Sequence, residues 1–278
     1  MRDSDRPIGV FDSGIGGLSV LKEAINILTD EKFIYFGDTA RIPYGIRTPE
    51  EIEKFTEESF EFLKKQGVKA GIIACNTATC YGLETVSKRF DFPIIGVVTP
   101  SCEAVHKITE NKNVALLATQ GTVNSKVYDE HFFDIDPFVD LRSVGCPDLV
   151  VAIENGHIDD EYVEKIIEKY LNEINEFDYD TLILGCTHFP HARKAIERVL
   201  NKSNRKVNLV DPARTTALDL KAILEKEGLL KGNCLESEND SKIVFYTTAN
   251  IEKFKKTAIE IVGQMIEESN FEEISLEE

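Results

Sequence analysis

Two short segments of the chain each place a cysteine directly after an aliphatic run. The first reads IIACNTA over residues 72–78, and the second reads LILGCTH over residues 182–188. A free thiol has a reference pKa of about 8.5, so thiol and thiolate are both reachable near neutral pH and the group can take or give a proton. Cys75 and Cys186 are therefore candidates for acid–base chemistry, against the alternatives of buried filler or a disulfide pair.

A second pair of similar segments precedes these cysteines. In residues 9–14, GVFDSG, and in residues 115–121, ALLATQG, small and polar residues follow a short apolar run. The repetition suggests two related halves, although segments this short also arise by chance. Because open α/β sheets bind ligands at the carboxyl ends of their strands, we expect a pseudo-twofold arrangement with one thiol on each side of a cleft.

Short apolar runs alternate with longer amphipathic runs, which predicts an α/β fold with mainly parallel sheets flanked by helices. Strands that are apolar throughout agree with sheets covered on both faces. Strands are expected at residues 7–11, 32–36, 70–74, 93–97, 114–118, 140–143, 181–184, 206–210 and 242–247. Helices are expected at residues 17–28, 50–66, 78–90, 101–108, 123–132, 148–154, 160–176, 191–200, 214–227 and 251–267. The acidic stretch 266–278 is interpreted as a solvated helix end and tail.

The composition excludes several classes of protein. The chain has 278 residues, with 32 Lys plus Arg against 49 Asp plus Glu, and a formal net charge of −17. This charge argues against a general nucleic-acid binder and against adhesion to anionic lipid. No apolar run approaches the ~20 residues of a membrane span, and the N-terminus lacks an apolar signal region. We therefore expect a cytoplasmic protein with no nucleic-acid or membrane partner.

Six cysteines in a chain of this length are too sparse for a disulfide scaffold. Outside the two strand-end segments, the cysteines are interpreted as buried apolar filler. These are Cys80, Cys102, Cys146 and Cys234.

Four motifs carry a resemblance to a known family. They are FDSGIGGLSV (residues 11–20), YFGDTARIPYG (35–45), ACNTAT (74–79) and LGCTHFP (184–190). In this order and spacing, they make the chain similar to the glutamate racemases of the aspartate/glutamate racemase superfamily. Two departures are Thr79, where Ser is usual, and the segment CPDLVVAIENG (146–156), which lacks a second Pro often seen there.

The resemblance implies the fold and the activity. The expected activity is racemisation of L-glutamate to D-glutamate for peptidoglycan biosynthesis, with no cofactor and no metal. The expected architecture is two α/β lobes with the active site in the cleft between them. The first lobe would comprise residues 1–98 plus 211–278 and carry Cys75, and the second would comprise residues 99–210 and carry Cys186. Homodimers are common in the family, and a homodimer is expected here.

Racemisation removes the proton from Cα and returns one on the other face, so one base must work from each side of a planar intermediate. The resemblance assigns deprotonation of D-glutamate to Cys75 and deprotonation of L-glutamate to Cys186. It also implies that Asp12 assists on the Cys75 side and His188 on the Cys186 side, with Glu154 as a further candidate.

The same resemblance implies the positions that bind the substrate. These are Asp12, Ser13, Tyr44, Gly45, Asn76, Thr77, Thr187 and His188. Hydroxyls, amides and backbone N–H groups at helix N-termini can hold carboxylates without Lys or Arg, so attraction of the anionic substrate is expected to be local. Gly14, Gly16 and Gly17 would allow the backbone to approach the ligand closely. Thr77 and Thr187 are equally suited to helix capping.

The residues leave other interpretations open. Asp38 matches the family's acidic residue after the second strand and could take part in catalysis, but an isolated Asp there is often a cap or turn residue. Gly14 and Gly16, followed by Asp38, resemble part of a dinucleotide fingerprint, although Ser19 occupies the third glycine position. A non-catalytic amino-acid-binding module would also have two lobes. Within the superfamily, an aspartate racemase is the nearest competing interpretation, although a CTE-type sequence commonly replaces CTH around the second cysteine there.

A metal site is a further alternative, because Cys186, His188 and His191 are spaced like ligands. A closed zinc site needs four ligands, and the chain has no Cys-x-x-Cys pair to complete one. The motif is therefore interpreted without a metal.

Overall fold

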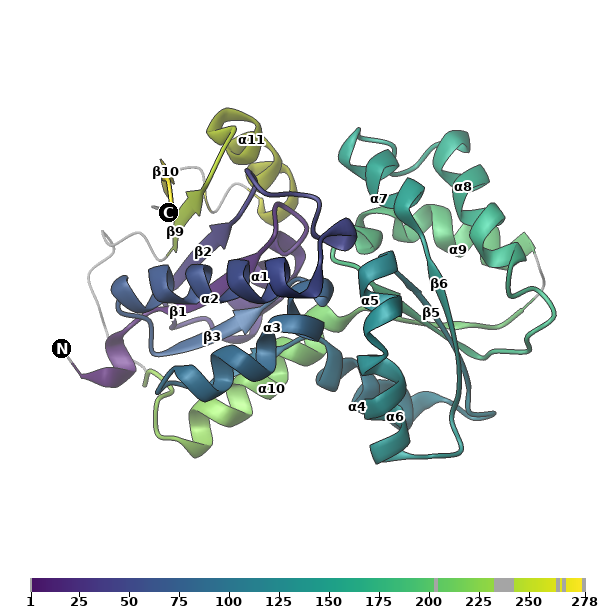
Figure 1. The fold of residues 1–278 in the computed structure, drawn as a ribbon, viewed down its shortest axis with the longest axis horizontal. Coiled ribbons are helices and arrows are strands. Elements are labelled where there is room, and N and C mark those ends of the chain that lie inside the picture. The colour runs from purple at the N-terminus through teal and green to yellow at the C-terminus, as the bar shows by residue number, and fades with distance from the viewer. Residues whose placement is uncertain (1, 203–204, 233–242, 264–265, 267–268, 277–278) are drawn as a thin grey trace. The chain divides into compact units, whose positions relative to one another are not determined.

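The computed structural model describes residues 2–202, 205–232, 243–263, 266 and 269–276. Contacts divide the chain into two compact units, Met1–Val97 with Ala213–Glu278, and Val98–Pro212. Each unit contains a parallel sheet flanked by helices, which confirms the predicted α/β class (Figure 1). Among the described residues, no helix is both long and apolar enough to cross a membrane.

In the first unit, the described strands form one six-stranded parallel sheet in the order β10-β9-β2-β1-β3-β4. Their bounds are β1 Ile8–Asp12, β2 Phe33–Gly37, β3 Ala70–Ile73, β4 Ile94–Gly96, β9 Ile243–Thr247 and β10 Asn270–Glu273. The register of β1 runs from Ile8↔Phe33 to Asp12↔Gly37 on the β2 side, and β3 lies on its other side. Because the strands are parallel, β1, β2 and β3 end at one edge of the sheet.

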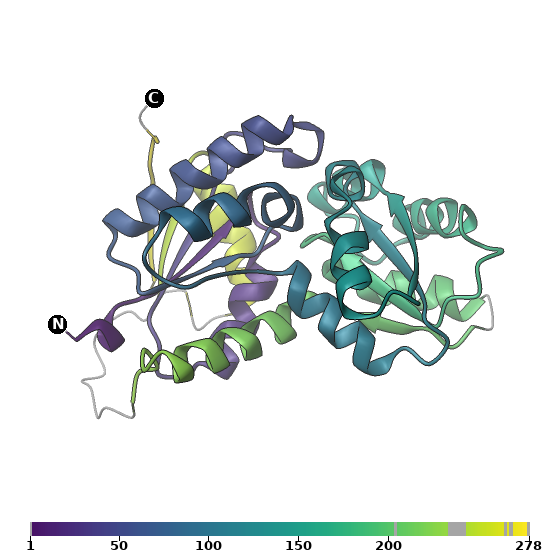
Figure 2. The same ribbon diagram turned by 60° about the horizontal axis from the view of Figure 1, so that its bottom comes forward.

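Helices cover both faces of this sheet (Figure 2). One face packs on α1 Leu18–Ile27, α10 Pro212–Lys226 and α11 Ile251–Val262, and the other on α2 Pro49–Lys65 and α3 Asn76–Arg89. Neighbouring residues of β1 serve opposite cores, Val10 the first and Phe11 the second. Burial on both faces explains why the strands are apolar throughout.

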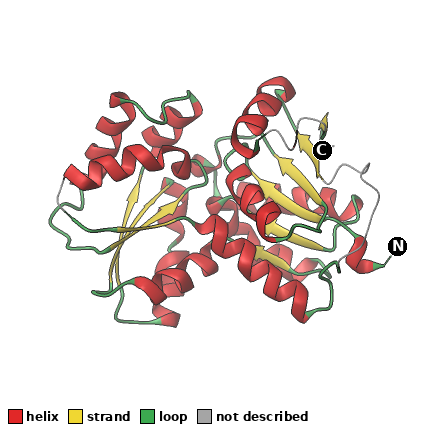
Figure 3. Ribbon diagram, turned by 180° about the vertical axis from the view of Figure 1, so that it is seen from behind, coloured by secondary structure: helices red, strands yellow, loops and turns green. Residues whose placement is uncertain are grey.

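The second unit has a four-stranded parallel sheet in the order β6-β5-β7-β8. Its strands are β5 Asn113–Ala118, β6 Asp140–Gly145, β7 Thr181–Gly185 and β8 Asn208–Val210. One core contains side chains of α7 Pro147–Glu154, α8 Glu161–Asn172 and α9 Arg193–Lys202. The other helices of this unit are α4 Val98–Ile108, α5 Gln120–Ser125 and α6 Val127–Ile135. Figure 3 shows the yellow strands of this unit between red helices.

Three expected elements differ in the structure. The helix predicted at 123–132 is two helices, α5 and α6, because Lys126 between them has a left-handed φ of 61°. The helix predicted at 251–267 ends at Val262, and its positions 264–265 and 267 lie outside the described residues. Position 242 of the last predicted strand also lies outside them. The interpretation of 266–278 as a helix end and tail is wrong, because it contains β10. That strand forms because Phe271 stacks on Phe245, with ring centroids 4.5 Å apart.

A buried ion pair lies at the opposite, amino edge of the first sheet. The side chains of Lys69 and Glu31 are each 1% exposed, and their charged atoms are 2.5 Å apart. Lys69 Nζ also donates to the Ser4 carbonyl at 2.6 Å, and the Lys231 backbone N–H donates to Glu31 at 2.8 Å. Burial lowers the pKa of Lys69, although the bond to Glu31 opposes this. The pair therefore joins four segments that lie far apart in the sequence.

Replacing Lys69 with Met should leave a buried carboxylate without its cation and lower the free energy of unfolding by about 3–5 kcal/mol. Adding Glu31→Leu should recover much of this loss, because an apolar pair needs no desolvation of charge. Urea denaturation measures both effects. The control is Lys88→Met, whose exposed pair with Glu84 should contribute little. A wild-type urea midpoint for Lys69→Met would contradict this account.

Candidate active site

The carboxyl edge of the first sheet brings together polar residues from three neighbouring strands. Asp12 ends β1, Asp38 follows β2, and Cys75 follows β3 two residues after its end. Backbone hydrogen bonds hold the strand ends in register, since the Asp38 N–H donates to the Asp12 carbonyl at 3.0 Å and the Ala74 N–H donates to the Phe11 carbonyl at 2.8 Å. Parallel pairing therefore gathers side chains that are widely separated in sequence.

Cys75 occupies the N-cap of α3. Its Sγ accepts a hydrogen bond from the Ala78 backbone N–H at 3.5 Å, and the residue is 6% exposed. The Thr79 hydroxyl donates to the Cys75 carbonyl at 2.9 Å. The partial positive charge at the start of a helix stabilises negative charge on a sulfur placed there. The capping role considered for Thr77 is thus filled by the thiol itself.

Asp12 is fully buried beside the start of α1. Its Oδ2 accepts a hydrogen bond from the Gly14 N–H at 2.9 Å. A Cβ on Gly17 would lie 2.6 Å from Asp12 Cβ and 2.8 Å from Ala74 Cβ, closer than real side chains approach. Glycine at position 17 therefore lets the start of α1 approach the Asp12 and Ala74 strand ends.

The other expected substrate positions of this unit are buried around the same edge. Ser13, Asn76 and Thr77 are almost fully buried, whereas Gly45 is partly exposed in the short turn η2, Tyr44–Ile46. The Tyr44 hydroxyl donates to Asp38 Oδ2 at 2.6 Å. Burial, followed by the charge and hydrogen bond of Asp38, raises the pKa of Tyr44 well above its ordinary value.

The second unit holds the other three expected catalytic residues in contact. Cys186 directly follows β7, and its Sγ lies 3.6 Å from His188 Nδ1. The other ring nitrogen of His188, Nε2, lies 3.3 Å from Glu154 Oε1 at the end of α7. Burial alone would lower the pKa of His188, but the hydrogen bonds and charges of Cys186 and Glu154 outweigh it and raise the pKa to about 10. The groups on both sides of the His188 ring therefore favour its protonated form.

Thr187 is buried next to Cys186, in the turn before the short helix η3, Phe189–Ala192. The N-cap of that helix is His188, so Thr187 does not cap it. Among the residues that the structure describes, no three His, Cys, Asp or Glu side chains are grouped to hold a metal.

The remaining cysteines fit the interpretation as filler only in part. Cys102 and Cys146 are completely buried, and burial raises the pKa of the Cys146 thiol. Cys80 is only partly buried. Cys234 lies outside the described residues.

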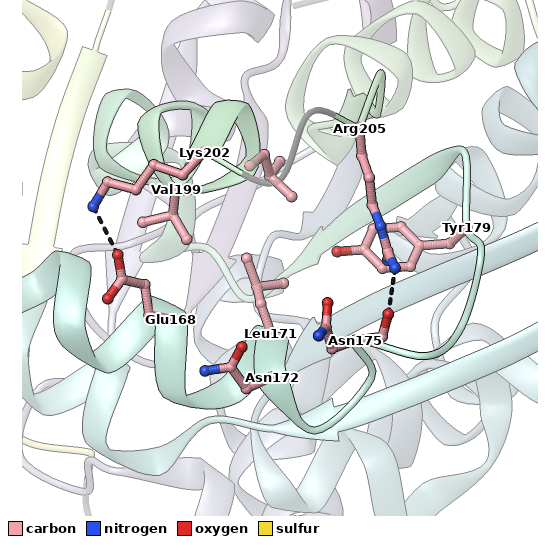
Figure 4. A pocket seen from close by; sticks show the side chains of 9 residues that line it. Glu168, Leu171, Asn172, Asn175, Tyr179, Val199, Lys202 and Arg205 are labelled. Atoms are coloured by element: carbon pink, nitrogen blue, oxygen red, sulfur yellow. Dashed lines mark hydrogen bonds and ion pairs between the residues drawn. The ribbon is translucent and has the colours of Figure 1, made fainter.

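A cavity of about 240 Å³ in the second unit is a separate feature (Figure 4). Tyr179 in its wall precedes β7, whereas Cys186 follows that strand, so the cavity lies at the amino end of the strand. The cations of its wall already have partners, because Lys202 Nζ binds Glu168 at 2.7 Å and Arg205 Nη1 donates to the Phe177 carbonyl at 2.9 Å. We therefore do not include this cavity in the candidate active site.

Comparison with known proteins agrees with the motifs. The family model Asp/Glu/Hydantoin racemase matches residues 8–219. A glutamate racemase from Bacillus cereus is 40% identical over 273 residues, covering 98% of each chain. The crystal structure of glutamate racemase isoform RacE1 from Bacillus anthracis matches with a TM-score of 0.89 at 34% identity, covering 98% of each chain. That of glutamate racemase from Francisella tularensis, in complex with D-glutamate, matches at 0.87 and 34% identity, covering 99% of each chain.

The fold and these matches define an enzyme of the amino-acid racemase class. The chain belongs to the Asp/Glu/Hydantoin racemase family, as its four motifs predicted. The dinucleotide-binding and binding-module interpretations are therefore set aside.

Sequence reasoning missed Arg41 and Thr248, which both bind Asp38. Arg41 lies inside the quoted motif YFGDTARIPYG, three residues after Asp38, and that spacing was the available signal.

Replacing Glu154 with Gln should lower the pKa of His188 towards its ordinary value, because one of the two groups that favour the imidazolium loses its charge. The pH titration of the His188 ring nitrogens by NMR measures this shift. Protonation of His188 stabilises the fold fully below pH ~6.5, the unfolded value, and this contribution is lost as pH rises towards about 10. The difference in unfolding free energy between wild type and Glu154→Gln should therefore shrink across that window.

The matched control is Glu197→Gln, a glutamate of the same unit that pairs with Arg193 on the surface. It should leave the His188 titration unchanged. An unchanged titration in Glu154→Gln as well would contradict the electrostatic role of Glu154.

Proposed function

We propose that this enzyme interconverts L- and D-glutamate without a cofactor, using Cys75 and Cys186 as its two acid–base groups. The observation that carries the proposal is the shared position of the thiols. Each follows a buried parallel strand at the carboxyl edge of its own sheet, and each residue is 6% exposed. A reactive thiol must be reachable by substrate yet shielded from bulk water, and this position provides both.

The proposed step in the direction from L to D begins with the thiolate of Cys186. It takes the Cα proton, the C–H electron pair remains on a planar carbanion conjugated with the α-carboxylate, and the Cys75 thiol gives a proton to the opposite face. One proton is removed and one returned, so no oxidant or co-reactant is needed. The reverse reaction uses the same two groups with exchanged roles.

The neighbours of each thiol support different contributions. His188 as an imidazolium, 3.6 Å from Cys186 Sγ, stabilises the thiolate that this step requires, and Glu154 holds that cation. On the other side, the start of α3 stabilises charge on Cys75, and the buried Asp12 is proposed to assist.

Substrate binding is proposed to be local, because the net charge of −17 repels a glutamate anion. The proposed groups are neutral donors at strand and helix ends, together with the His188 cation and the Asp12 carboxylate, which can accept from the substrate ammonium. They are Asp12, Ser13, Tyr44, Gly45, Asn76, Thr77, Thr187 and His188. The support is their position beside the thiols within each unit and their match to the family's motifs.

We also propose the setting of the reaction. The D-glutamate would serve peptidoglycan biosynthesis in the cytoplasm, by a homodimer whose lobes are residues 1–98 plus 211–278 and residues 99–210. The support is the family resemblance and a pair of compact units with similar boundaries. The pseudo-twofold relation and the cleft stay predictions. Light scattering after size exclusion tests the dimer.

Replacing either thiol should abolish most racemisation, because a serine hydroxyl rarely ionises without an activating base. Cys75→Ser and Cys186→Ser should each lower kcat by about 10²–10⁴-fold, the usual contribution of an acid–base group, and the double variant should be little worse. In D₂O at early conversion from L-glutamate, the D-product should carry deuterium and the recovered L-glutamate should not. Polarimetry and NMR measure the two quantities.

The matched control is Cys80→Ser, on α3 five positions after Cys75, which should racemise normally. A Cys75→Ser enzyme with near wild-type rate and normal deuterium in the product would falsify the two-thiol mechanism. L-Aspartate should be a poor substrate in the same assay, and faster turnover of aspartate than of glutamate would instead identify an aspartate racemase.

Purified enzyme should keep full activity after exhaustive dialysis against a chelator and should show no visible chromophore. The physical reason is that two thiols already supply both proton transfers, so neither a Schiff base nor a Lewis acid is needed. Activity is assayed with L-glutamate before and after dialysis. Loss of activity that pyridoxal phosphate or zinc restores would contradict cofactor independence.

A further inference from the structure

Asp38 is a fully buried carboxylate whose two oxygens accept three hydrogen bonds from side chains. The Tyr44 hydroxyl and Arg41 Nε each lie 2.6 Å from Oδ2, and the Thr248 hydroxyl lies 3.0 Å from Oδ1. A buried charge is tolerated only when it is paired and hydrogen-bonded, and Asp38 has both kinds of partner. The geometry therefore fits a carboxylate that its neighbours hold in one position.

Arg41 connects Asp38 to helix α2. Its Nη1 binds Glu58, and its guanidinium lies 4.1 Å from the ring centroid of Phe55, both on α2. Burial alone would lower the pKa of Arg41, but the charge of Asp38 and the bond to Glu58 raise it. A planar guanidinium can meet two carboxylates and a ring at once, which the single ammonium of Lys cannot.

Thr248, just after β9, joins the same carboxylate from the C-terminal part of the chain. Its hydroxyl donates to Asp38 and accepts from the Ala40 N–H at 2.8 Å. Next to it, the hydroxyls of Thr39 and Thr247 lie 2.7 Å apart, and the Ala249 N–H donates to Thr39 Oγ1 at 2.9 Å. Residues 247–249 therefore hold the loop that starts at Asp38.

The group that receives this support is Tyr44. Its hydroxyl has one proton, which is directed to Asp38, and its ring packs 5.6 Å from Phe55 and 6.4 Å from Phe11 between centroids. Tyr44 is thus held at both ends, by its ring and by its hydroxyl. It begins the turn η2 that contains Gly45.

We infer that Arg41 and Thr248 are positioning residues of the racemase reaction, which act through Asp38 to fix the Tyr44–Gly45 turn for substrate binding. The inference rests on the proposed function, because Tyr44 and Gly45 are substrate positions only under that proposal. Asp38 is then the shared joint of the cluster. Neither Arg41 nor Thr248 takes part in proton transfer.

The expected kinetic signature is a change in KM and not in kcat. Thr248→Val keeps the shape of the side chain and removes both the bond to Asp38 and the acceptor of the Ala40 N–H. Arg41→Lys keeps the charge and removes the planar guanidinium. Each should raise KM for L-glutamate by about tenfold, the scale of one hydrogen bond to a charged group, with kcat within about threefold. In an Asp38→Asn background, Thr248→Val should raise KM by clearly less than tenfold, because the hydrogen bond to a charged carboxylate is already lost and only the weaker bonds of Thr248 remain.

Two matched controls make the same chemical changes away from Asp38. Thr85→Val removes a hydroxyl that binds the carboxylate of Glu53, and Arg89→Lys replaces a guanidinium that binds Glu57 and Glu61 of α2. Both should keep the wild-type KM. Circular dichroism and the urea midpoint establish that each variant is folded, and Thr248→Val decides the matter if Arg41→Lys does not fold.

Three results would overturn the inference. They are an unchanged KM in folded Thr248→Val, a fall in kcat with KM unchanged, and an undiminished tenfold rise in KM when Thr248→Val is added to Asp38→Asn. Wild-type enzyme that fails to racemise glutamate would instead reject the proposed function. Calorimetric binding of D-glutamate to Thr248→Val in a Cys75→Ser background separates the two failures. The dissociation constant is expected to be tenfold higher there than in Cys75→Ser alone, and its measurement does not depend on turnover.

Discussion

The parallel alignment of strands is the constraint on which the rest of the structure depends. Parallel strands all end at one edge, so Asp12, Asp38 and Cys75 come together although they belong to three separate parts of the sequence. The same edge receives the start of α3, whose first turn lacks backbone acceptors and so binds the Cys75 sulfur. The helix end supplies unpaired N–H donors and the strand ends supply polar side chains, so both kinds of group occur at the same edge of the sheet. Such an edge requires close packing, and Gly17 allows it at the start of α1 because a side chain there would clash with Asp12 and Ala74.

The buried ion pair and the candidate catalytic residues of the first unit lie at opposite edges of its sheet. The buried pair of Lys69 and Glu31 joins four chain segments at the amino edge, where the strands begin. The network around Asp38 is built from similar bonds at the carboxyl edge, but one of its members is Tyr44, in the turn that is expected to bind substrate. The buried pair at the amino edge thus joins segments of the fold, whereas the buried carboxylate at the carboxyl edge also holds a turn that is proposed to bind substrate.

Sequence patterns predicted the alternation of strands and helices because burial on both faces leaves continuous apolar runs. The same runs mark where strands end, and so they also placed Cys75 and Cys186 at strand ends. They did not predict β10, since its polar residues outnumber Phe271, whose stacking on Phe245 is a tertiary contact. They missed the break at Lys126, because one left-handed residue leaves no periodic signal. Thr248 was also missed, since its bond to Asp38 spans most of the chain. Local pattern thus predicts elements, whereas long-range polar bonds appear only in the folded structure.

The surroundings of the two thiols are chemically unlike, and thermodynamics limits what this difference can do in the proposed reaction. Cys186 has the imidazolium of His188 beside it, held by Glu154, whereas Cys75 accepts a backbone N–H at the start of a helix. A full cation interacts with a negative charge more strongly than a helix end does, so the two thiols have unequal electrostatic surroundings. L- and D-glutamate have identical free energies in water, so kcat/KM must be the same in both directions. In the proposed reaction, the kcat values of the two directions can therefore differ only by the same factor as their KM values. The enantiomer with the lower KM is then also the one that is turned over more slowly.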